Sequence, residues 1–448
     1  MNMVVFSGFY ASKKKAYTKT INGFIPTSLV VPVRLLDGDR CIIRVQVGDT
    51  VEEGECIAAS ENPDTGKSLS YAPAPGTVME IGECRCPNGT VSEGIRIRLG
   101  GTFRFLGRRL EMRDVQQLSA EEMLSEIEKQ GIINTFVTDK PLTLAKSIRD
   151  ARAEHPFLIV RLFDEDPSRI TDSLISAHFL EEVYSGAAAT ATALRAAGII
   201  FITEKEFSGQ KDFEFGCPAA FVPVDERRYP AAFKKDICAA VRKALKNTPF
   251  CAASEQSLFT DSPTMQETHR AIRFGIPVID RYVHVSGDCI NASGLMKVAI
   301  GTPLSYLAEQ CGGLRRSLRT AIVNGQISGF AVDNLDAPVT KYVKSVVFLS
   351  SRHIAERIST ACARCGNCRR ACPRHLAPDI IYRHITGEII AENDYLRSTA
   401  LCSLCGLCNS VCSARLPICQ TIDRFKKEHF IRRNVRQAAP AAVMQGAQ

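Results

Sequence analysis

The C-terminal part of the chain is decided by residues 362–373, which read CARCGNCRRACP in one-letter code. The four cysteines follow the pattern C-x2-C-x2-C-x3-C-P, a spacing that lets three thiolates from one loop bind three irons of a cubane cluster. Thirty residues after Cys372 the same spacing returns at residues 402–412, as CSLCGLCNSVC, with Ser413 in place of the proline. We therefore predict two [4Fe–4S] clusters.

The repeat also predicts how the ligands are shared. In folds that hold two such clusters, the fourth cysteine of each run ligates the other cluster. The first predicted ligand set is therefore Cys362, Cys365, Cys368 and Cys412, and the second is Cys402, Cys405, Cys408 and Cys372. Cys419 lies outside both runs, and we expect iron binding not to need it. Zinc is the alternative metal, because paired C-x-x-C elements also hold it, but a third cysteine two residues later fits iron better.

Composition places these cysteines in a reducing compartment. The chain has 448 residues, 45% of them hydrophobic and 23% charged, which is enough apolar material for several folded cores. It contains no apolar run long enough for a membrane span and no basic leader before an apolar segment, so we expect a cytoplasmic protein. Nine of the 18 cysteines fall within residues 362–419. In the cytosol such clustering indicates metal binding rather than disulfides.

The formal charge is concentrated beside the cysteines. From Ser351 onward, fifteen Arg and Lys stand against seven Asp and Glu, an excess of eight that equals the net charge of the whole chain. Four arginines are interleaved with the predicted ligands: Arg364, Arg369, Arg370 and Arg374. They either present a docking face for an acidic redox partner such as a ferredoxin or flavodoxin, or merely offset the charge of the clusters. We expect no nucleic-acid partner.

The remainder of the chain predicts a multidomain α/β plus β protein. Two segments, 47–58 and 72–78, each combine a turn with a strand and resemble the halves of a biotinyl/lipoyl-type barrel-sandwich hybrid. After them, helices alternate with short apolar runs, which favours an α/β layer with parallel strands. The predicted domains are a barrel-sandwich hybrid at 1–110, an α/β Rossmann-like layer at 111–278, a β-grasp domain resembling soluble-ligand-binding domains at 279–350, a helical ferredoxin-like domain with two clusters at 351–436, and a disordered tail at 437–448.

Taken in order, these parts resemble the RnfC family of electron-transport subunits and its relative, the cobalamin reductase of propanediol-utilising microcompartments. The resemblance covers about residues 25–420. Besides the cysteine runs, it is carried by 275–281, 301–303 with 311–313, and 336–341. In that family the α/β layer is similar to the flavin- and NADH-binding subunit of respiratory complex I. The resemblance implies FMN and NADH binding through a Gly-Gly-Ala-Gly-Phe-Pro loop and an acidic Glu-x-Glu-Pro turn.

This chain departs from the family at both elements. Where the glycine-rich loop is expected, residues 131–141 read GIINTFVTDKP, with one glycine. Side chains there would keep backbone N–H groups away from a phosphate. The acidic turn remains as Asp164, Glu165 and Asp166 before Pro167, with Asp172 beyond it. Those three acidic residues are the candidate FMN or NADH ligands, and the altered loop argues against both cofactors.

The first functional hypothesis is an iron–sulfur subunit that passes electrons through two [4Fe–4S] clusters to a partner reductase or electron-transport complex. It need not make or break bonds itself, so we predict no catalytic residue. Its partners would be a ferredoxin, a flavodoxin or a reductase subunit, and partner subunits would hold it at the inner face of a membrane. The alternatives are an NADH-dependent FMN and iron–sulfur flavoenzyme such as a cobalamin reductase, and a non-redox scaffold stabilised by zinc.

Overall fold

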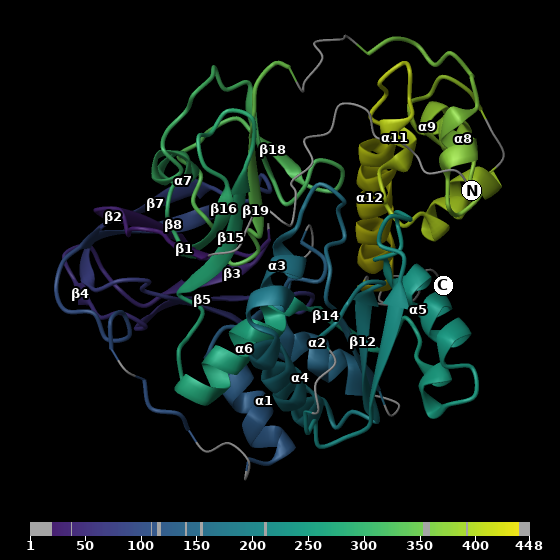
Figure 1. The fold of residues 1–448 in the computed structure, drawn as a ribbon. Helices are drawn as coiled ribbons and strands as arrows, with labels where there is room; N and C mark the ends of the chain where they lie inside the picture. The colour runs from purple at the N-terminus through teal and green to yellow at the C-terminus, as the bar shows by residue number, and fades with distance from the viewer. Residues whose placement is uncertain are drawn as a thin grey trace, which may run out of the picture. The chain divides into compact units, whose positions relative to one another are not determined.

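The structure is a computed structural model, which describes residues 20–36, 38–108, 110–113, 118–138, 141–152, 156–209, 213–352, 359–390 and 393–438. The chain forms two compact units, Met1–Ile354 (unit 1) and Ala355–Gln448 (unit 2) (Figure 1). None of the helices in the described ranges is both long and apolar enough to cross a lipid bilayer.

Unit 1 begins with two antiparallel sheets that share one apolar core. The strand order is β2-β8-β7-β4 in one sheet and β3-β5-β6 in the other. Ile57, Ile95 and Ile97 are fully buried between them, because alternate residues of a strand point to one face. The strands are β2 (Ser28–Pro32), β3 (Arg40–Ile43), β4 (Thr50–Val51), β5 (Cys56–Glu61), β6 (Ser68–Tyr71), β7 (Gly76–Arg85) and β8 (Val91–Leu99).

The hairpin between β5 and β6 is anchored at its tip. The Thr65 carbonyl accepts a hydrogen bond of 3.0 Å from the Thr143 N–H group. Gly66 has a positive φ, and a Cβ atom there would lie 2.5 Å from the Thr143 hydroxyl. Lys67 forms an ion pair of 3.8 Å with Glu61. In biotinyl and lipoyl domains the hairpin tip bears a lysine that carries the cofactor and must move freely. The tip that bears Lys67 instead packs against its neighbours, which favours a structural role.

The middle of unit 1 is a parallel sheet with helices on both faces. Its order is β13-β12-β11-β14, and every residue of β11 is buried, as expected for a covered parallel sheet. One core packs α1, α2, α3, α4 and α6 against one face, and a second core packs α5 against the other. The strands are β11 (Phe157–Arg161), β12 (Gly198–Glu204), β13 (Ala219–Val224) and β14 (Leu258–Asp261). The helices are α1 (Ala120–Lys129), α2 (Leu144–Ala151), α3 (Thr171–His178), α4 (Leu180–Leu194), α5 (Lys234–Ala244), η3 (Pro249–Ala252) and α6 (Ser262–Phe274), with a short hairpin of β9 (Ile133–Asn134) and β10 (Leu142–Thr143).

A mixed six-stranded sheet completes unit 1, in the order β1-β16-β15-β19-β17-β18. Its strands are β1 (Thr20–Asn22), β15 (Asp280–Ser286), β16 (Gly294–Ala299), β17 (Thr320–Val323), β18 (Phe330–Val332) and β19 (Ser345–Leu349), with helix α7 (Leu304–Gln310). Strand β1 pairs in parallel with β16, so it joins this sheet and not the sheets of the segment 1–110 to which it was assigned from the sequence. The pairing covers an edge that would otherwise expose unpaired backbone groups.

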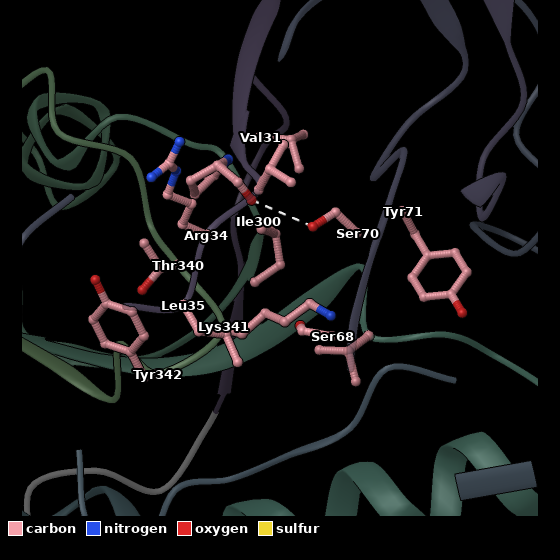
Figure 2. Close-up of a pocket in the computed structure, with 13 residues that line it drawn as sticks. Val31, Arg34, Leu35, Ser68, Ser70, Tyr71, Ile300, Thr340, Lys341 and Tyr342 are labelled. Carbon is pink, nitrogen blue, oxygen red and sulfur yellow. Dashed lines mark hydrogen bonds between the residues drawn. The ribbon is translucent and has the colours of Figure 1, made fainter. Parts of the chain in front are cut away.

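Lys341 lines a pocket together with residues of β2 and β6 (Figure 2), and its contacts join three parts of unit 1. Its buried ammonium donates hydrogen bonds to the carbonyl oxygens of Leu69 in β6 and of Gly131 after α1, the latter at 2.9 Å. Burial lowers the pKa of Lys341 to about 8. Gly131 has a φ of +66°, and a Cβ atom there would lie 2.8 Å from both the Leu69 oxygen and the Lys341 nitrogen. The single glycine of the altered loop is therefore needed for packing.

Unit 2 consists of short helices between the cysteines and one longer helix after them. The elements are α8 (Asn367–Ala371), α9 (Pro378–Ile385), α10 (Asn393–Arg397), η4 (Ser398–Leu401), α11 (Leu407–Ser410) and α12 (Ile418–Ala438). Ile381, Ile418 and Ile422 are buried among the cysteines. The predicted tail starts inside α12 at residue 437, and residues 439–448 lie outside the described part of the chain.

The contact between α4 and α6 gives a test of the packing in unit 1. A Cβ atom on Gly186 would lie 1.8 Å from the Met265 carbonyl oxygen, so Gly186→Ala must force the two helices apart. We expect it to lower the free energy of unfolding by about 2–3 kcal/mol, despite the better helix propensity of alanine. Gly100→Ala is the control, because a Cβ atom there meets nothing within 4 Å. The stability of both variants is measured by urea unfolding, followed by circular dichroism. Equal unfolding midpoints for the two variants would contradict the close contact of α4 and α6 at Gly186.

Candidate metal centre

The two cysteine runs have the same local backbone, displaced by 40 residues, so that Cys362 corresponds to Cys402 and Cys372 to Cys412. Each run places left-handed residues at three matching positions, and the second of them is a glycine that starts a short helix, α8 or α11. The pairs are Arg364 (φ 51°) and Leu404 (φ 57°), Gly366 (φ 72°) and Gly406 (φ 73°), and His375 (φ 53°) and Arg415 (φ 54°). The side chains differ at two of the three pairs, so the shared cysteine and glycine spacing accounts for the common backbone.

One pocket of unit 2 is lined by thiols from both runs. Its cysteines are Cys362, Cys365, Cys368 and Cys412, the four members of the first predicted ligand set. A backbone hydrogen bond of 3.1 Å from the Thr360 N–H group to the Ala414 oxygen holds the start of the first run beside the end of the second. The structure therefore brings the fourth cysteine of the second run to the first three of the first run.

The second group of thiols contains one cysteine more than predicted. Cys402, Cys405 and Cys408 interact electrostatically with one another, and Cys402 also interacts with Cys372. All three in addition interact with Cys419. The side-chain oxygen of Asn409 lies 2.8 Å from the Cys419 nitrogen and 3.8 Å from the Cys408 sulfur, so it holds these two residues beside each other. The sequence places Cys419 outside both runs, and its position beside Cys408 was not predicted. The available signal was its spacing, since Cys419 follows Cys412 by seven residues.

Backbone N–H groups surround the sulfur atoms in the same way at both groups. The Leu376 N–H group lies 3.4 Å from the Cys372 sulfur, and the Leu416 N–H group lies 3.5 Å from the Cys412 sulfur. The N–H group of Asn367 donates to Cys365, and that of Leu407 donates to Cys405, its counterpart. Such donors stabilise thiolates and tune the potential of a bound cluster.

The two groups differ in their exposure to water. Cys365 is exposed, and the Asn367 N–H group lowers the pKa of its thiol. Its counterpart Cys405 is buried, and burial raises the pKa of that thiol to about 11. Burial also raises the pKa of Cys368 to about 11. A metal that binds Cys368 or Cys405 must therefore displace the proton of a thiol whose pKa is raised.

Within the described part of the chain, no three Cys, His, Asp or Glu side chains converge on a point suited to one metal ion. A tetrahedral zinc site has thiolates about 2.3 Å from a single ion. In a cubane, by contrast, each thiolate binds a different iron, so the ligands surround a larger volume. A ligand set for a cubane is recognised by thiols that line a common pocket, as Cys362 and Cys412 do.

The acidic turn of unit 1 is bound internally. The Asp164 carboxylate accepts hydrogen bonds from the Arg169 guanidinium (2.9 Å) and from the N–H groups of Asp172 and Ser173 (3.1 Å each). Burial opposes its ionisation, but Arg169 and these N–H groups outweigh burial and lower the pKa of Asp164. Its oxygens thus cap helix α3 and are occupied.

The other two candidate residues of the turn are also engaged. One oxygen of Asp166 accepts from the N–H groups of Ile327 and Ser328, at 2.8 and 2.9 Å, in the loop before β18. Glu165 pairs with Arg161 at 3.6 Å, and only 14% of its side chain is exposed. The structure brings the three candidates together, but it directs them to partners within the protein.

The altered loop uses its polar groups in the same way. Thr135 is fully buried; its N–H group donates to the Thr264 hydroxyl and its hydroxyl to Asp261, both at 3.0 Å. The Asn134 amide donates to the Phe259 carbonyl at 2.8 Å. Asn134 and Thr135 therefore direct their polar groups to partners inside the protein, at positions where a phosphate cradle has glycine. These two residues do not fit the phosphate of FMN.

A buried ion network lies beside the turn and the loop. The Lys344 ammonium contacts Asp172 at 3.0 Å and also pairs with Asp261, and Arg161 lies 3.4 Å from Asp172. All four side chains are fully buried. Arg161 additionally lies over the ring of Phe136, 4.2 Å from its centroid. Asp172, the acidic residue beyond the turn, is thus neutralised by two cations of the chain itself.

Comparison with known proteins identifies relatives for most of the chain. A family model described as the RnfC barrel sandwich hybrid domain matches residues 7–101. The chain is 26% identical over 383 residues to the C subunit of the proton-translocating ferredoxin:NAD(+) oxidoreductase complex of Clostridium ljungdahlii, covering 83% of this chain and 81% of that protein. It is 24% identical to the C subunit of the ion-translocating oxidoreductase complex of Rhodobacter capsulatus, covering 79% and 69%. The corresponding Serratia proteamaculans protein is 25% identical, and 52% of it is covered.

The chain is therefore RnfC-like, as predicted from the sequence, and its barrel-sandwich hybrid and mixed α/β content are confirmed. Among solved structures, a chain of an NAD+-reducing [NiFe]-hydrogenase in the air-oxidised state aligns with a TM-score of 0.47 and 14% identity. That alignment covers 72% of this chain and 63% of the other.

Proposed function

We propose that the protein is an RnfC-like electron-transfer subunit that carries electrons through two [4Fe–4S] clusters to a partner subunit. The observation that carries the proposal is the pocket lined by Cys362, Cys365, Cys368 and Cys412, because it joins three thiols of one run to the fourth of the other. This is the sharing of ligands that two-cluster folds use. The second ligand set is Cys402, Cys405, Cys408 and Cys372, supported by the electrostatic contacts among them.

The clusters would supply one-electron oxidation and reduction, while the chain holds and tunes them. Thiolates fix the irons, and N–H groups such as that of Leu376 at Cys372 stabilise negative charge on sulfur. The names of the relatives describe subunits of ion-translocating or ferredoxin:NAD(+) oxidoreductase complexes. By analogy this chain would bind partner subunits of such a complex and lie peripherally at the inner face of the membrane.

The first site is the better candidate for exchange with a soluble donor. Cys365 is exposed, whereas its counterpart Cys405 is buried. Arg364 and Arg370 are exposed on either side of Cys365. Arg369 forms a two-pronged ion pair with Asp379, at 2.6 and 2.7 Å, whereas Arg370 donates to the uncharged oxygens of Cys365 and Asn367. We therefore assign the docking role to Arg364 and Arg370 and a structural role to Arg369.

Metal analysis tests the proposal directly. Because the two ligand sets each hold a full cubane, protein reconstituted under anaerobic conditions should contain about eight irons and eight sulfides per chain. Iron, acid-labile sulfide and zinc are measured on the same sample. About two zincs and no sulfide would instead support the zinc scaffold and reject electron transfer by this chain.

Flavin and nicotinamide are tested on the same material. The Thr135 N–H group and the oxygens of Asp164 and Asp166 already have internal partners. We therefore expect substoichiometric FMN, and we expect NADH to bleach the cluster absorption much more slowly than dithionite or a reduced ferredoxin does. Stoichiometric FMN with rapid bleaching by NADH would favour the flavoenzyme alternative.

The docking assignment predicts an effect of charge on the rate of reduction. Arg364→Gln with Arg370→Gln should slow reduction by a reduced ferredoxin about tenfold at low salt, with the iron content unchanged, because steering depends on local charge. Added salt should shrink the difference, since about 0.1 M screens charges beyond about 10 Å. Arg227→Gln with Arg228→Gln in unit 1 removes the same charge from exposed positions and serves as the control. Reduction rates are measured by stopped flow. If both double variants are reduced at equal rates, the docking role is wrong and the interleaved arginines serve only to offset the charge of the clusters.

A further inference from the structure

The two halves of unit 2 differ at one position beside the thiols. Helices α9 and α12 begin at Pro378 and Ile418, so their second residues are Asp379 and Cys419. Each of these follows the fourth cysteine of its run by seven residues. Asp379 lines the first pocket, and its N–H group donates to the Cys368 sulfur. Cys419 therefore occupies the equivalent place at the second group of thiols.

At the first site the residue in this position is restrained. The Asp379 carboxylate is buried and is held by the Arg369 guanidinium through contacts of 2.6 and 2.7 Å. A carboxylate in such an ion pair is not available as a ligand without breaking it, which leaves a buried charge uncompensated. The first site thus has four thiols and no additional free donor among these residues.

At the second site, the residues equivalent to Arg369 and Asp379 are Asn409 and Cys419, and they form no ion pair. Asn409 stands where Arg369 stands in the first run, and its side-chain oxygen accepts a hydrogen bond of 2.8 Å from the Cys419 N–H group. The same oxygen accepts a hydrogen bond of 3.8 Å from the Cys408 thiol, so Asn409 places the backbone of Cys419 directly beside Cys408. Cys402, Cys405 and Cys408 all interact electrostatically with Cys419. Cys419 therefore adds a fifth thiol to the four of the second predicted ligand set.

We propose that Cys419 is a fifth thiol ligand at the second site, able to replace Cys408 on the iron that Cys408 binds. This inference rests on the proposed function, because it assumes a cubane there. In the exchange, Cys419 loses its proton and forms an Fe–S bond, while the Cys408 sulfur leaves the iron and takes up a proton. No electron is transferred. The first site has no equivalent exchange, since its counterpart is Asp379.

Alanine variants separate the two sites without supplying an oxygen ligand. We expect Cys408→Ala to retain about eight irons and two cubanes after anaerobic reconstitution, because Cys419 takes the vacant place. Cys368→Ala, the matched change at the first site, should lose about four irons or show the EPR signal of a three-iron cluster. Cys408→Ala with Cys419→Ala should do the same at the second site. Cys419→Ala alone should retain about eight irons.

The outcomes distinguish the inference from the proposed function. If wild-type protein binds zinc and no sulfide, the proposed function fails. If wild type holds about eight irons but Cys408→Ala loses as much iron as the double variant, the fifth-ligand inference alone is wrong. The inference is also wrong if Cys368→Ala keeps both cubanes, because the first site would then tolerate loss of the matching cysteine without a fifth thiol. The irons remaining at the unaltered site, together with the circular dichroism spectrum, report that each variant is folded.

Discussion

Unit 2 depends on one constraint: the fourth cysteine of each run has to lie beside the first three of the other run. Neither run can satisfy this alone, so the two must fold together. The turn after each fourth cysteine meets the constraint with a left-handed residue, His375 or Arg415, after which α9 or α12 begins almost at once. The apolar core there is small, and in units of this kind metal binding contributes directly to folding.

The grouping of Cys362, Cys365, Cys368 and Cys412 around one pocket was predictable because its information is local. Spacing within each run fixes three thiols around one loop, and the sharing of the fourth follows from the repeat. Cys419 was not predictable in this way, because its place depends on how α12 starts relative to the second run. Only comparison of the two halves, with Asp379 at the matching position, identifies it. The barrel-sandwich hybrid was likewise visible in two local segments, whereas the pairing of β1 with β16 joins residues more than 270 positions apart and had no local signal.

At the acidic turn, residue type alone suggests ligand binding, but the carboxylates have partners within the protein. Three carboxylates beside a proline resemble a ligand-binding turn, and sequence alone does not reveal their partners. One partner, Arg169, is close in sequence, but Ile327 and Ser328, which donate to Asp166, come from a loop of the distant six-stranded sheet. Buried carboxylates must be paired or hydrogen-bonded. In this chain, which has Thr135 and Phe136 where glycines are expected, the acidic residues of the turn therefore need partners within the protein. The loop and the turn are therefore both held by contacts within the protein.

Under the proposed function, burial and charge would give the two halves of unit 2 different parts in electron transfer. At the first site, Asp379 and Arg369 neutralise each other, so this pair adds little net charge beside Cys368. At the second site the equivalent residues are Asn409 and Cys419, so neither pair adds a large net charge at this position. Exposure separates the two sites, because Cys365 meets water and Cys405 does not. Solvent and nearby arginines both stabilise added negative charge on a cluster, which favours reduction at the first site. A partner would therefore meet the chain at the first site, and the buried second site would stand between that contact and the rest of a complex.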